Sequence, residues 1–308
     1  TIHRVDVCQI DEMREIFNEY SFHGIIHFAA YKAVGESVEK PLEYYDNNLG
    51  GLINILLEAE KLNNTLPFIF SSSCTVYGQA DDMPITENAP VKMAESPYGN
   101  TKQIGEEIIQ DVCRVNSNMN AIALRYFNPI GSHSSALIGD CSADKPSNLV
   151  PIITEVAIGK REKITVFGDD YNTPDGTCIR DYIHVVDLAK SHVLAMDFLV
   201  NNPGKHAFNV GTGIGVSVLD AVKAFEKTNN LSINYSIGPR RDGDIEQIYA
   251  NGSLVKAKLG WKAKESLEKA MKSAWDWEQK IRKARNTKNR YLFITRKLGY
   301  TEYMKIKS

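Results

Sequence analysis

The sequence predicts an α/β fold, with a Rossmann-like doubly wound parallel sheet followed by a smaller mixed α/β domain. Short apolar runs at 67–70 and 121–126 are typical of buried parallel strands. Longer amphipathic segments alternate with such runs, as expected when helices cover both faces of a sheet. After Pro129 this alternation gives way to a segment rich in Gly, Ser, Asp and Pro, which is typical of a loop.

The composition indicates a globular chain and excludes several classes of protein. Its 308 residues are 43% hydrophobic and 24% charged, which supplies a core for one large or two modest domains. A formal net charge of −2 predicts no overall attraction to nucleic acid or to a membrane surface. No apolar run is long enough to cross a bilayer, and we expect no signal peptide at residue 1.

The five cysteines are an odd, scattered set without a Cys-x-x-Cys motif. This pattern predicts neither a disulfide framework nor a metal site, and it favours a reducing cytoplasmic compartment. Cys74 lies beside a serine cluster, where a small buried filler is the more common role of a thiol than a reactive nucleophile.

The first half of the chain alternates strands and helices. We expect a strand at 1–7, an amphipathic helix at 12–20 and a buried strand at 24–30, where His27 is interpreted as a core residue. A long helix at 41–62 leads to the strand at 67–70. Ser71, Ser72 and Ser73 follow at the carboxyl end of that strand, the edge where open α/β sheets bind ligands.

The helix after this edge carries a chemically useful pair. Ser96 can cap it and Pro97 suits its first turn, while Tyr98 and Lys102, four residues apart, share one face. A nearby ammonium is expected to lower the pKa of a tyrosine, which is ordinarily about 10. Ser, Tyr and Lys so placed can take a proton from a sugar hydroxyl while a hydride leaves the same carbon. The bare Tyr-x-x-x-Lys spacing is weak evidence, because a half-buried tyrosine beside a solvated lysine gives the same pattern.

In the second half we expect a helix that begins at 148–151, a strand at 164–168 and a helix at 187–199. A strand at 207–211 is expected to return to the first sheet. Residues 213–215 are predicted to form a turn before a helix at 217–227. A last helix extends through Trp275, and the basic segment 280–290 is expected to be a solvated helix or tail.

The serine strand end followed by the capped Tyr-x-x-x-Lys helix resembles the extended short-chain dehydrogenase/reductase family and, within it, the UDP-galactose 4-epimerases. The similarity extends from about residue 5 to about residue 278, and 31–37, 176–187 and 240–244 match the epimerase pattern closely. The resemblance implies reversible inversion at C4 of UDP-galactose and UDP-glucose through a transient 4-keto sugar, with tightly bound NAD. It also implies a homodimer, an NAD-binding domain at 1–128 joined by 181–212, and a mainly UDP-sugar-binding domain at 129–308.

The resemblance assigns functional residues position by position. The catalytic residues are Ser73, Tyr98 and Lys102, which also contact the cofactor. The further cofactor-binding residues are Asp6, Val7, Phe28, Ala29, Ala30, Lys32, Asn47, Tyr126 and Phe127. The substrate-binding residues are Lys32, Ser73, Thr75, Tyr98, Asn128, Asn148, Leu149, Thr165, Val166, Phe167, Arg180, Arg241, Asp244 and Ile248. Ile248 is intermediate in size at a position that lines the hexose pocket in epimerases, so the pattern leaves N-acetylated sugars open.

The chain departs from the family pattern in one respect, because it contains no Gly-x-Gly-x-x-Gly motif. The resemblance implies a further strand, helix and strand, on the order of 50 residues, before residue 1. The sequence is therefore expected to be a fragment, or else a chain that holds its cofactor poorly.

The motifs bear on four alternatives to a UDP-galactose 4-epimerase. Dehydratases of the family carry an Asp-Glu pair after the catalytic Ser or Thr, and Cys74–Tyr77 offers none. A decarboxylase or a UDP-glucuronate epimerase stays open on motif grounds. A non-catalytic nucleotide-sugar-binding protein is the alternative from another class, suggested by the missing glycine motif.

Overall fold

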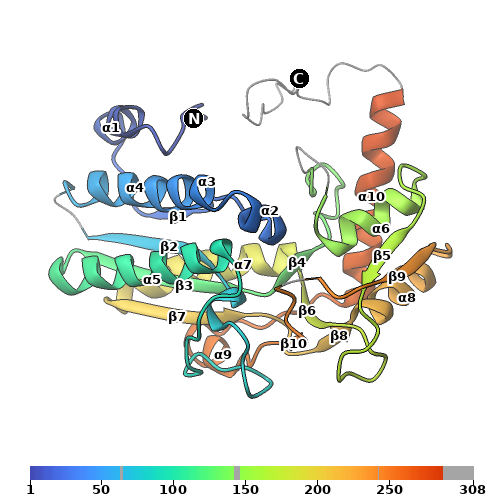
Figure 1. The fold of residues 1–308 in the computed structure, drawn as a ribbon. Coiled ribbons are helices and arrows are strands. Elements are labelled where there is room, and N and C mark those ends of the chain that lie inside the picture. Colours follow the sequence, from blue (N-terminus) through green and yellow to red (C-terminus); the bar gives the residue numbers. More distant parts are fainter. Residues whose placement is uncertain (63–64, 142–145, 242, 287–308) are drawn as a thin grey trace.

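A four-stranded parallel sheet in the order β1-β2-β3-β7 forms the first layer of the structure (Figure 1). This computed structural model describes residues 1–62, 65–141, 146–241 and 243–286. The strands are β1 (Ile25–His27), β2 (Leu66–Ser73), β3 (Met119–Tyr126) and β7 (Lys205–Val210). All eight residues of β2 are buried, which explains its nearly continuous apolar sequence. The predicted α/β class and the return of the strand near residue 207 are confirmed.

Helices cover both faces of this sheet. On one face lie α4 and α5, whose side chains pack with Phe68 and Phe70 of β2. On the other lie α7 and α9, which pack with Ile69 and Leu124. The helices and helical turns of this part are α1 (Ile10–Glu19), α2 (Val34–Glu39), α3 (Pro41–Tyr45), the π-turn η1 (Asp46–Gly50), α4 (Gly51–Ala59), the 3₁₀ turn η2 (Cys74–Tyr77), α5 (Pro97–Val115), α7 (Val185–Asn201) and α9 (Ser253–Leu259).

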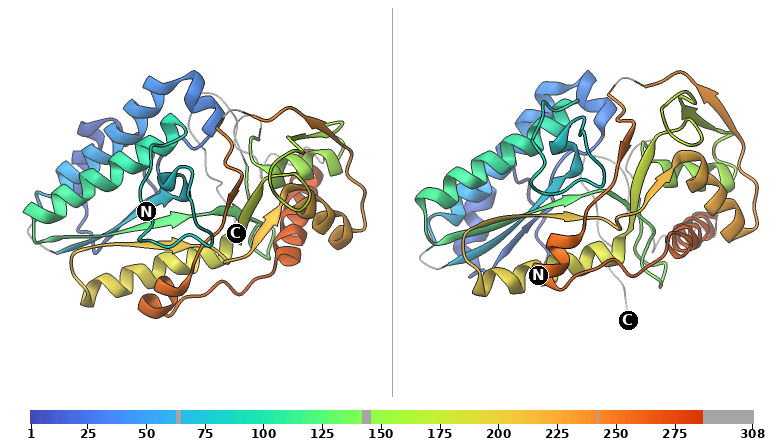
Figure 2. Two further views of the ribbon diagram at one scale, coloured as in Figure 1. Left: turned by 60° about the horizontal axis from the view of Figure 1, so that its bottom comes forward. Right: turned by 90° about the horizontal axis from the view of Figure 1, so that it is seen from below.

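A second group of elements adjoins the carboxyl ends of the strands (Figure 2). It contains the sheet β10-β6-β4, in which β6 also pairs with β8, and the parallel pair β5-β9. Its elements are β4 (Asn128–Ile130), α6 (Leu149–Ala157), β5 (Ile164–Phe167), β6 (Ile179–His184), β8 (Gly215–Ser217), α8 (Val218–Asn229), β9 (Tyr235–Gly238), β10 (Gln247–Ile248) and α10 (Leu267–Asn286).

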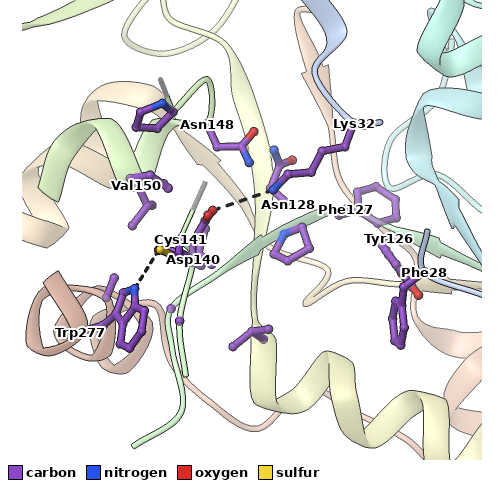
Figure 3. Close-up of a pocket in the computed structure, with 18 of the residues that line it drawn as sticks. Phe28, Lys32, Tyr126, Phe127, Asn128, Asp140, Cys141, Asn148, Val150 and Trp277 are labelled. Carbon is purple, nitrogen blue, oxygen red and sulfur yellow. Dashed lines mark hydrogen bonds and ion pairs between the residues drawn. The ribbon is translucent and has the colours of Figure 1, made fainter. Parts of the chain in front are cut away.

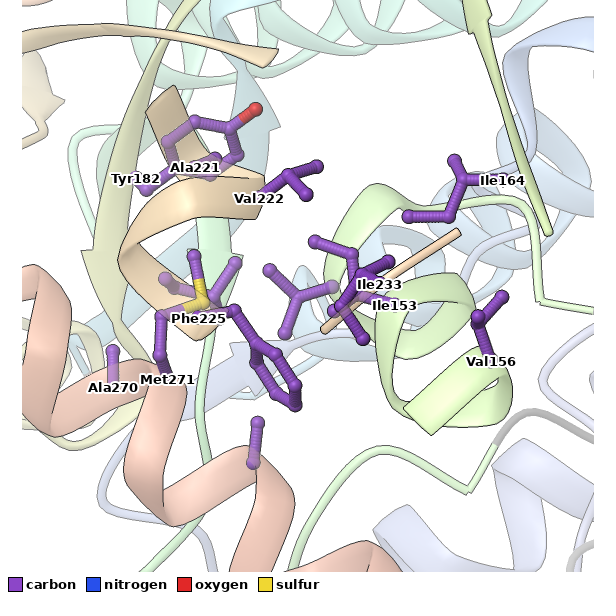
Figure 4. Packing of buried hydrophobic residues seen from close by; sticks show 13 residues of the cluster. Ile153, Val156, Ile164, Tyr182, Ala221, Val222, Phe225, Ile233, Ala270 and Met271 are labelled. Atoms are coloured by element: carbon purple, nitrogen blue, oxygen red, sulfur yellow. The ribbon is translucent and has the colours of Figure 1, made fainter. Parts of the chain in front are cut away.

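This second group has its own apolar core, shown in Figure 4. Phe225 of α8, Met271 of α10 and Ile153 of α6 meet there, and each is fully buried. The division into an NAD-binding domain at 1–128 with 181–212 and a UDP-sugar-binding domain at 129–308 remains a prediction, although two separate cores accord with it.

Three predicted elements differ from the structure. Residues 1–7 are not a strand but an irregular segment that ends in a turn, where the Gln9 N–H donates to the Asp6 carbonyl at 2.8 Å. A β-strand needs a second strand to pair with, and no strand among the described residues pairs with this segment. The helix predicted at 41–62 consists of α3, η1 and α4 in succession. The strand predicted at 24–30 shortens to β1, whose Ile26 side chain is 39% exposed because β1 lies at the edge of the sheet.

Two further features concern the ends of elements. The turn predicted at 213–215 runs into β8, which pairs antiparallel with β6 and which the sequence pattern did not reveal. The predicted tail at 280–290 begins within α10, where Ile281 is buried, and residues 287–290 lie outside the described part.

None of the helices in the described ranges combines the length with the apolar character that a membrane-spanning helix needs.

Replacing Gly105 with alanine tests how tightly α5 packs on the sheet. A methyl group there would lie 2.7 Å from Cζ of the buried Phe70 ring. We expect Gly105→Ala to destabilise the protein by about 1–3 kcal/mol through overpacking, although alanine gains about 1 kcal/mol of helix propensity. Urea unfolding measures the difference. Gly50→Ala is the matched control, because open space surrounds Gly50, and this variant should be unchanged or slightly stabilised.

Candidate active site

A cavity of about 1000 Å³ opens at the carboxyl ends of the parallel strands. Strand ends of β2 and β3, the start of α5, β4, α6 and α10 contribute to its wall, and Figure 3 shows the part between Phe28 and Trp277. The sequence-predicted residues that line it are Phe28, Ala30, Lys32, Ser73, Thr75, Tyr98, Lys102, Tyr126, Phe127, Asn128 and Asn148. The three predicted catalytic side chains therefore share one cavity.

Local capping places these three side chains. Ser73 ends β2 and its hydroxyl accepts a hydrogen bond from the Thr75 N–H at 3.2 Å, which starts η2. Ser96 caps α5 by accepting from the Gly99 N–H at 3.2 Å, so Tyr98 lies in the first turn of the helix beside the strand end. Ser73 and Tyr98 both line the cavity, and the Ser73 hydroxyl acts to lower the pKa of Tyr98.

Lys102 is a buried cation. Its side chain is 5% exposed, and Nζ lies 5.8 Å from the centre of the Tyr98 ring and 5.0 Å from that of Phe70. In the described part of the chain no carboxylate forms an ion pair with it. Burial lowers the pKa of Lys102 to about 8.

The expected low pKa of Tyr98 is not found. Burial raises the pKa of Tyr98 to about 12, and the Ser73 hydroxyl lowers it only in part. Burial, and not the Lys102 ammonium 5.8 Å from the ring centre, sets the direction of this pKa shift. The arrangement is thus suited to a tyrosine that keeps its proton until a further positive charge enters the cavity.

A buried ion pair beneath the cavity went unnoticed in the sequence. Arg125 of β3 donates to both carboxylate oxygens of Glu106 on α5, from Nε at 2.9 Å and from Nη2 at 2.6 Å. The Ser72 hydroxyl donates to Glu106 at 2.5 Å, and Arg125 also donates to the Tyr77 hydroxyl at 2.8 Å. The one available signal was a glutamate one helical turn after Lys102.

A second set of predicted residues gathers near β5, β6 and β10, outside the residues that line the cavity. The Asp244 carboxylate lies 2.7 Å from Nη2 of Arg241 and 3.8 Å from Nη2 of Arg180. The Arg241 guanidinium lies 5.3 Å from the centre of the Phe167 ring. Ile248 pairs in register with Arg180, so the hydrophobic position and the cation are neighbours.

The remaining substrate-binding predictions lie close by, with different exposure. Thr165 is exposed on β5, whereas Val166 is buried, and Leu149 packs against the core of the second group. For Val166 and Leu149 the main chain is the part that stays available to a ligand.

The predicted residues at the N-terminal side form a third set. The Val7 carbonyl accepts from Asn54 at 3.1 Å, and the Cys8 thiol lies 3.5 Å from the Asn47 carbonyl, so Asp6, Val7 and Asn47 adjoin η1 and α4. These residues do not line the cavity. Ala29 is exposed at its edge, after β1.

His27 is buried in β1 as expected, stacked on Phe70 with ring centres 6.1 Å apart. Its Nε2 atom has no hydrogen-bond partner among the described groups. Burial lowers the pKa of His27 to about 4, so the ring is neutral.

The chain resembles known proteins over most of its length. Residues 1–274 match the family model described as GDP-mannose 4,6 dehydratase. The UDP-glucose 4-epimerase of Drosophila melanogaster is 47% identical over 278 residues, which cover 90% of this chain and 79% of that protein. The chain belongs to the UDP-glucose 4-epimerase family. The human UDP-glucose 4-epimerase is 46% identical over 275 residues, 89% of this chain and 79% of that protein.

Solved structures of this family share the fold. The UDP-glucose 4-epimerase of Bifidobacterium longum, in complex with NAD⁺ and UDP, gives a TM-score of 0.87 at 45% identity, over 90% of this chain and 82% of that one. The UDP-glucose 4-epimerase of Stenotrophomonas maltophila, with bound NAD and formylated UDP-arabinopyranose, gives a TM-score of 0.88 at 41% identity. The match covers 92% of this chain and 83% of that one. The resemblance to the extended short-chain dehydrogenase/reductase epimerases is thereby confirmed.

The cavity fits the reactive end of a dinucleotide. Lys102 lines it together with Ser73, Tyr98 and Tyr126, and within the described ranges its buried ammonium has no carboxylate partner and the buried Thr75 hydroxyl has no hydrogen-bond partner. Ribose hydroxyls would satisfy both groups. The flat side chains Phe28 and Phe127 border the same space and suit a nicotinamide ring.

Replacing Glu106 tests the buried ion pair. Glu106→Gln leaves the Arg125 guanidinium buried without its counter-charge, so we expect a loss of about 3 kcal/mol in unfolding free energy. Chemical denaturation followed by circular dichroism gives the value. Glu107→Gln changes the neighbouring exposed carboxylate and should stay within about 0.5 kcal/mol of the parent. Equal midpoints for the two variants would contradict the role of the pair.

Lys102 is expected to be costly for stability. Its pKa falls from 10.5 in the unfolded chain to about 8 in the fold, so the folded state binds fewer protons between these values. The cost of burying the charged ammonium lowers the unfolding free energy in full below pH 8, and this cost decreases as pH rises toward 10.5. Lys102→Met should therefore stabilise the nucleotide-free protein by roughly 1–3 kcal/mol at pH 7.

The measurement is urea unfolding at pH 7 and at pH 10, where the advantage of Lys102→Met should shrink. Lys223→Met, at a side chain that is 66% exposed, is the control and should show no such change. An advantage of Lys102→Met that stays constant with pH would argue against a penalised charge.

Proposed function

We propose that this chain is a UDP-glucose 4-epimerase that interconverts UDP-galactose and UDP-glucose by inversion at C4, with NAD as its cofactor. The observation that carries the proposal is the convergence of Ser73, Tyr98 and Lys102 in one cavity, where no carboxylate of the described residues forms an ion pair with the Lys102 ammonium. Relatives with this name at 46–48% identity, and the family structure with NAD⁺ and UDP, support it.

Tyr98 is proposed as the group that exchanges a proton with the C4 hydroxyl. NAD, when bound, supplies the acceptor and donor of the hydride, together with a positive charge on its oxidised ring. Added to Lys102, such a charge favours the phenolate and lowers the pKa of Tyr98 from about 12. Ser73 keeps the hydroxyl of the sugar and that of Tyr98 within one hydrogen-bonded set, so that the proton moves a short way in either direction.

Arg180, Arg241 and Asp244 are proposed to hold the uridine diphosphate. A guanidinium can fork two phosphate oxygens, and two of them meet here around one carboxylate. When phosphates engage the arginines, Asp244 is released to accept from ribose hydroxyls. Holding the nucleotide at a distance from C4 leaves the hexose free to turn, which inversion requires.

We also propose a cytoplasmic homodimer that binds neither nucleic acid nor membrane. All five cysteines are free thiols, which suits a reducing compartment, and the net charge is −2. The dimer rests on family resemblance, and sedimentation of the purified protein examines it.

Tyr98→Phe tests the proposed chemistry. Removing the hydroxyl should lower kcat for UDP-galactose at least about 100-fold, the low end for a general acid–base residue, while UDP still binds. Coupled assay of UDP-glucose formation measures the rate, and calorimetry measures UDP binding. Tyr235→Phe, on the exposed side of β9, is the control.

Turnover of UDP-galactose by Tyr98→Phe at close to the parent rate would refute the assignment. Activity of the parent on UDP-glucuronate, without activity on UDP-galactose, would instead favour an epimerase or decarboxylase of that sugar.

A further inference from the structure

A second tyrosine faces the same cavity and is held by different partners. Tyr126, the last residue of β3, has its hydroxyl 3.0 Å from the Ser71 hydroxyl and in hydrogen-bond contact with Nε2 of His192 on α7. Tyr126 and Ser71 line the cavity with Tyr98. Figure 3 shows Tyr126 beside Phe28, at the end of the cavity away from Trp277.

The direction of these hydrogen bonds follows from one carbonyl. Nδ1 of His192 lies 2.9 Å from the Leu188 carbonyl oxygen, which can only accept, so Nδ1 carries a proton. Burial lowers the pKa of His192, so the ring is neutral and its Nε2 atom is an acceptor. The single proton of the Tyr126 hydroxyl therefore has two acceptors in reach, the Ser71 oxygen at 3.0 Å and Nε2 of His192, and the neutral imidazole nitrogen is the stronger base.

Packing fixes the histidine in this orientation. His192 is 3% exposed, and the Phe28 ring covers it with ring centres 4.8 Å apart. Its own ring centre lies 5.3 Å from that of Tyr126. The acceptor is thus held in place behind the cavity wall by the rings of Phe28 and Tyr126.

Two parallel arrangements result. Ser71 and Ser73 are two residues apart on β2, so both point to the α7 side of the sheet. The Ser73 hydroxyl acts on the pKa of Tyr98, whose other neighbour is the ammonium of Lys102. The Ser71 hydroxyl contacts Tyr126, whose other neighbour is the neutral imidazole of His192. The two phenols interact electrostatically, since a charge on Tyr98 raises the pKa of Tyr126.

We propose that His192 is a positioning residue that holds the hydroxyl proton of Tyr126 away from the reacting centre, so that Tyr98 alone exchanges a proton with the sugar. This proposal rests on the proposed epimerase function. Without the acceptor, the Tyr126 hydroxyl donates to Ser71 instead, and the Ser71 proton then turns toward the cavity, where it competes with the sugar hydroxyl for Ser73 and Tyr98. His192 itself does not line the cavity and touches neither sugar nor cofactor in this proposal.

The kinetic test compares two replacements of the same ring. His192→Phe keeps an aromatic ring but removes the acceptor, whereas His192→Gln can present an amide oxygen near the position of Nε2. We expect His192→Phe to lower kcat for UDP-galactose roughly 3- to 10-fold, the effect of one hydrogen bond, with KM within about twofold. His192→Gln should recover most of this loss. His23→Phe, at an exposed histidine outside the cavity, is the control.

A double mutant separates positioning from packing. In a Tyr126→Phe background His192→Phe should cause no further loss, because the hydroxyl that it controls is gone. An equal loss in both backgrounds, or equal loss in His192→Phe and His192→Gln, would overturn the proposal and assign His192 to packing alone.

Nitrogen NMR of ¹⁵N-histidine-labelled protein tests the geometry without any turnover. One ring should show a protonated Nδ1 and an unprotonated Nε2 at pH 7, and its Nε2 signal should shift in Tyr126→Phe. A protonated Nε2 on His192 would overturn the proposal even if the kinetic variants fail to fold. The expected NMR pattern in a parent protein without epimerase activity would refute the proposed function and leave the His192–Tyr126 contact standing.

Discussion

The bidentate contact between Arg125 and Glu106 is the interaction on which the site depends. It joins β3 to α5 directly below the strand ends, and through the Ser72 hydroxyl it also includes β2. Each of these elements carries a cavity-lining side chain with a proposed role one or a few residues away: Ser73 on β2, Tyr98 and Lys102 on α5, and Tyr126 on β3. A buried pair with fixed geometry tolerates little sliding, so the helix keeps one register relative to the strands.

Successive side chains of β2 and β3 point to opposite faces of the sheet, and the two faces have different roles. Ser72 and Arg125 point to α5 and form the structural ion pair, while Ser71, Ser73 and Tyr126 point to the α7 side and toward the cavity. Because consecutive residues face opposite ways, the same short stretch supplies both the support and the reactive groups. Burial then sets the charges: a lysine with a reduced pKa, two neutral histidines and a tyrosine that retains its proton.

Much of the fold could be predicted because its signals are local. The buried strands at 67–70 and 121–126, the Ser96 cap and the return of the strand near residue 207 all follow from apolar runs and capping residues within a few positions. The segment 1–7 was predicted wrongly as a strand because a strand also needs a hydrogen-bonded neighbour, which local sequence does not supply. The three proposed catalytic residues carry a recognisable motif, whereas Glu106, Arg125 and His192 make contacts 19 to 66 residues apart in sequence, which no spacing reveals. The sign of the Tyr98 pKa shift also required the structure, since desolvation depends on the whole surrounding fold.

The contact of Asp244 with both Arg180 and Arg241 has a consequence for nucleotide selection. The two guanidinium groups already have a counter-ion, so an arriving phosphate gains only the difference between its own attraction and that of the carboxylate. A singly charged ligand gains little from this exchange of anions, whereas a diphosphate, with two charged groups, can satisfy both arginines at once. The carboxylate thus acts as an internal competitor that disfavours simpler anions, and it offsets one of the two positive charges before the sugar nucleotide arrives.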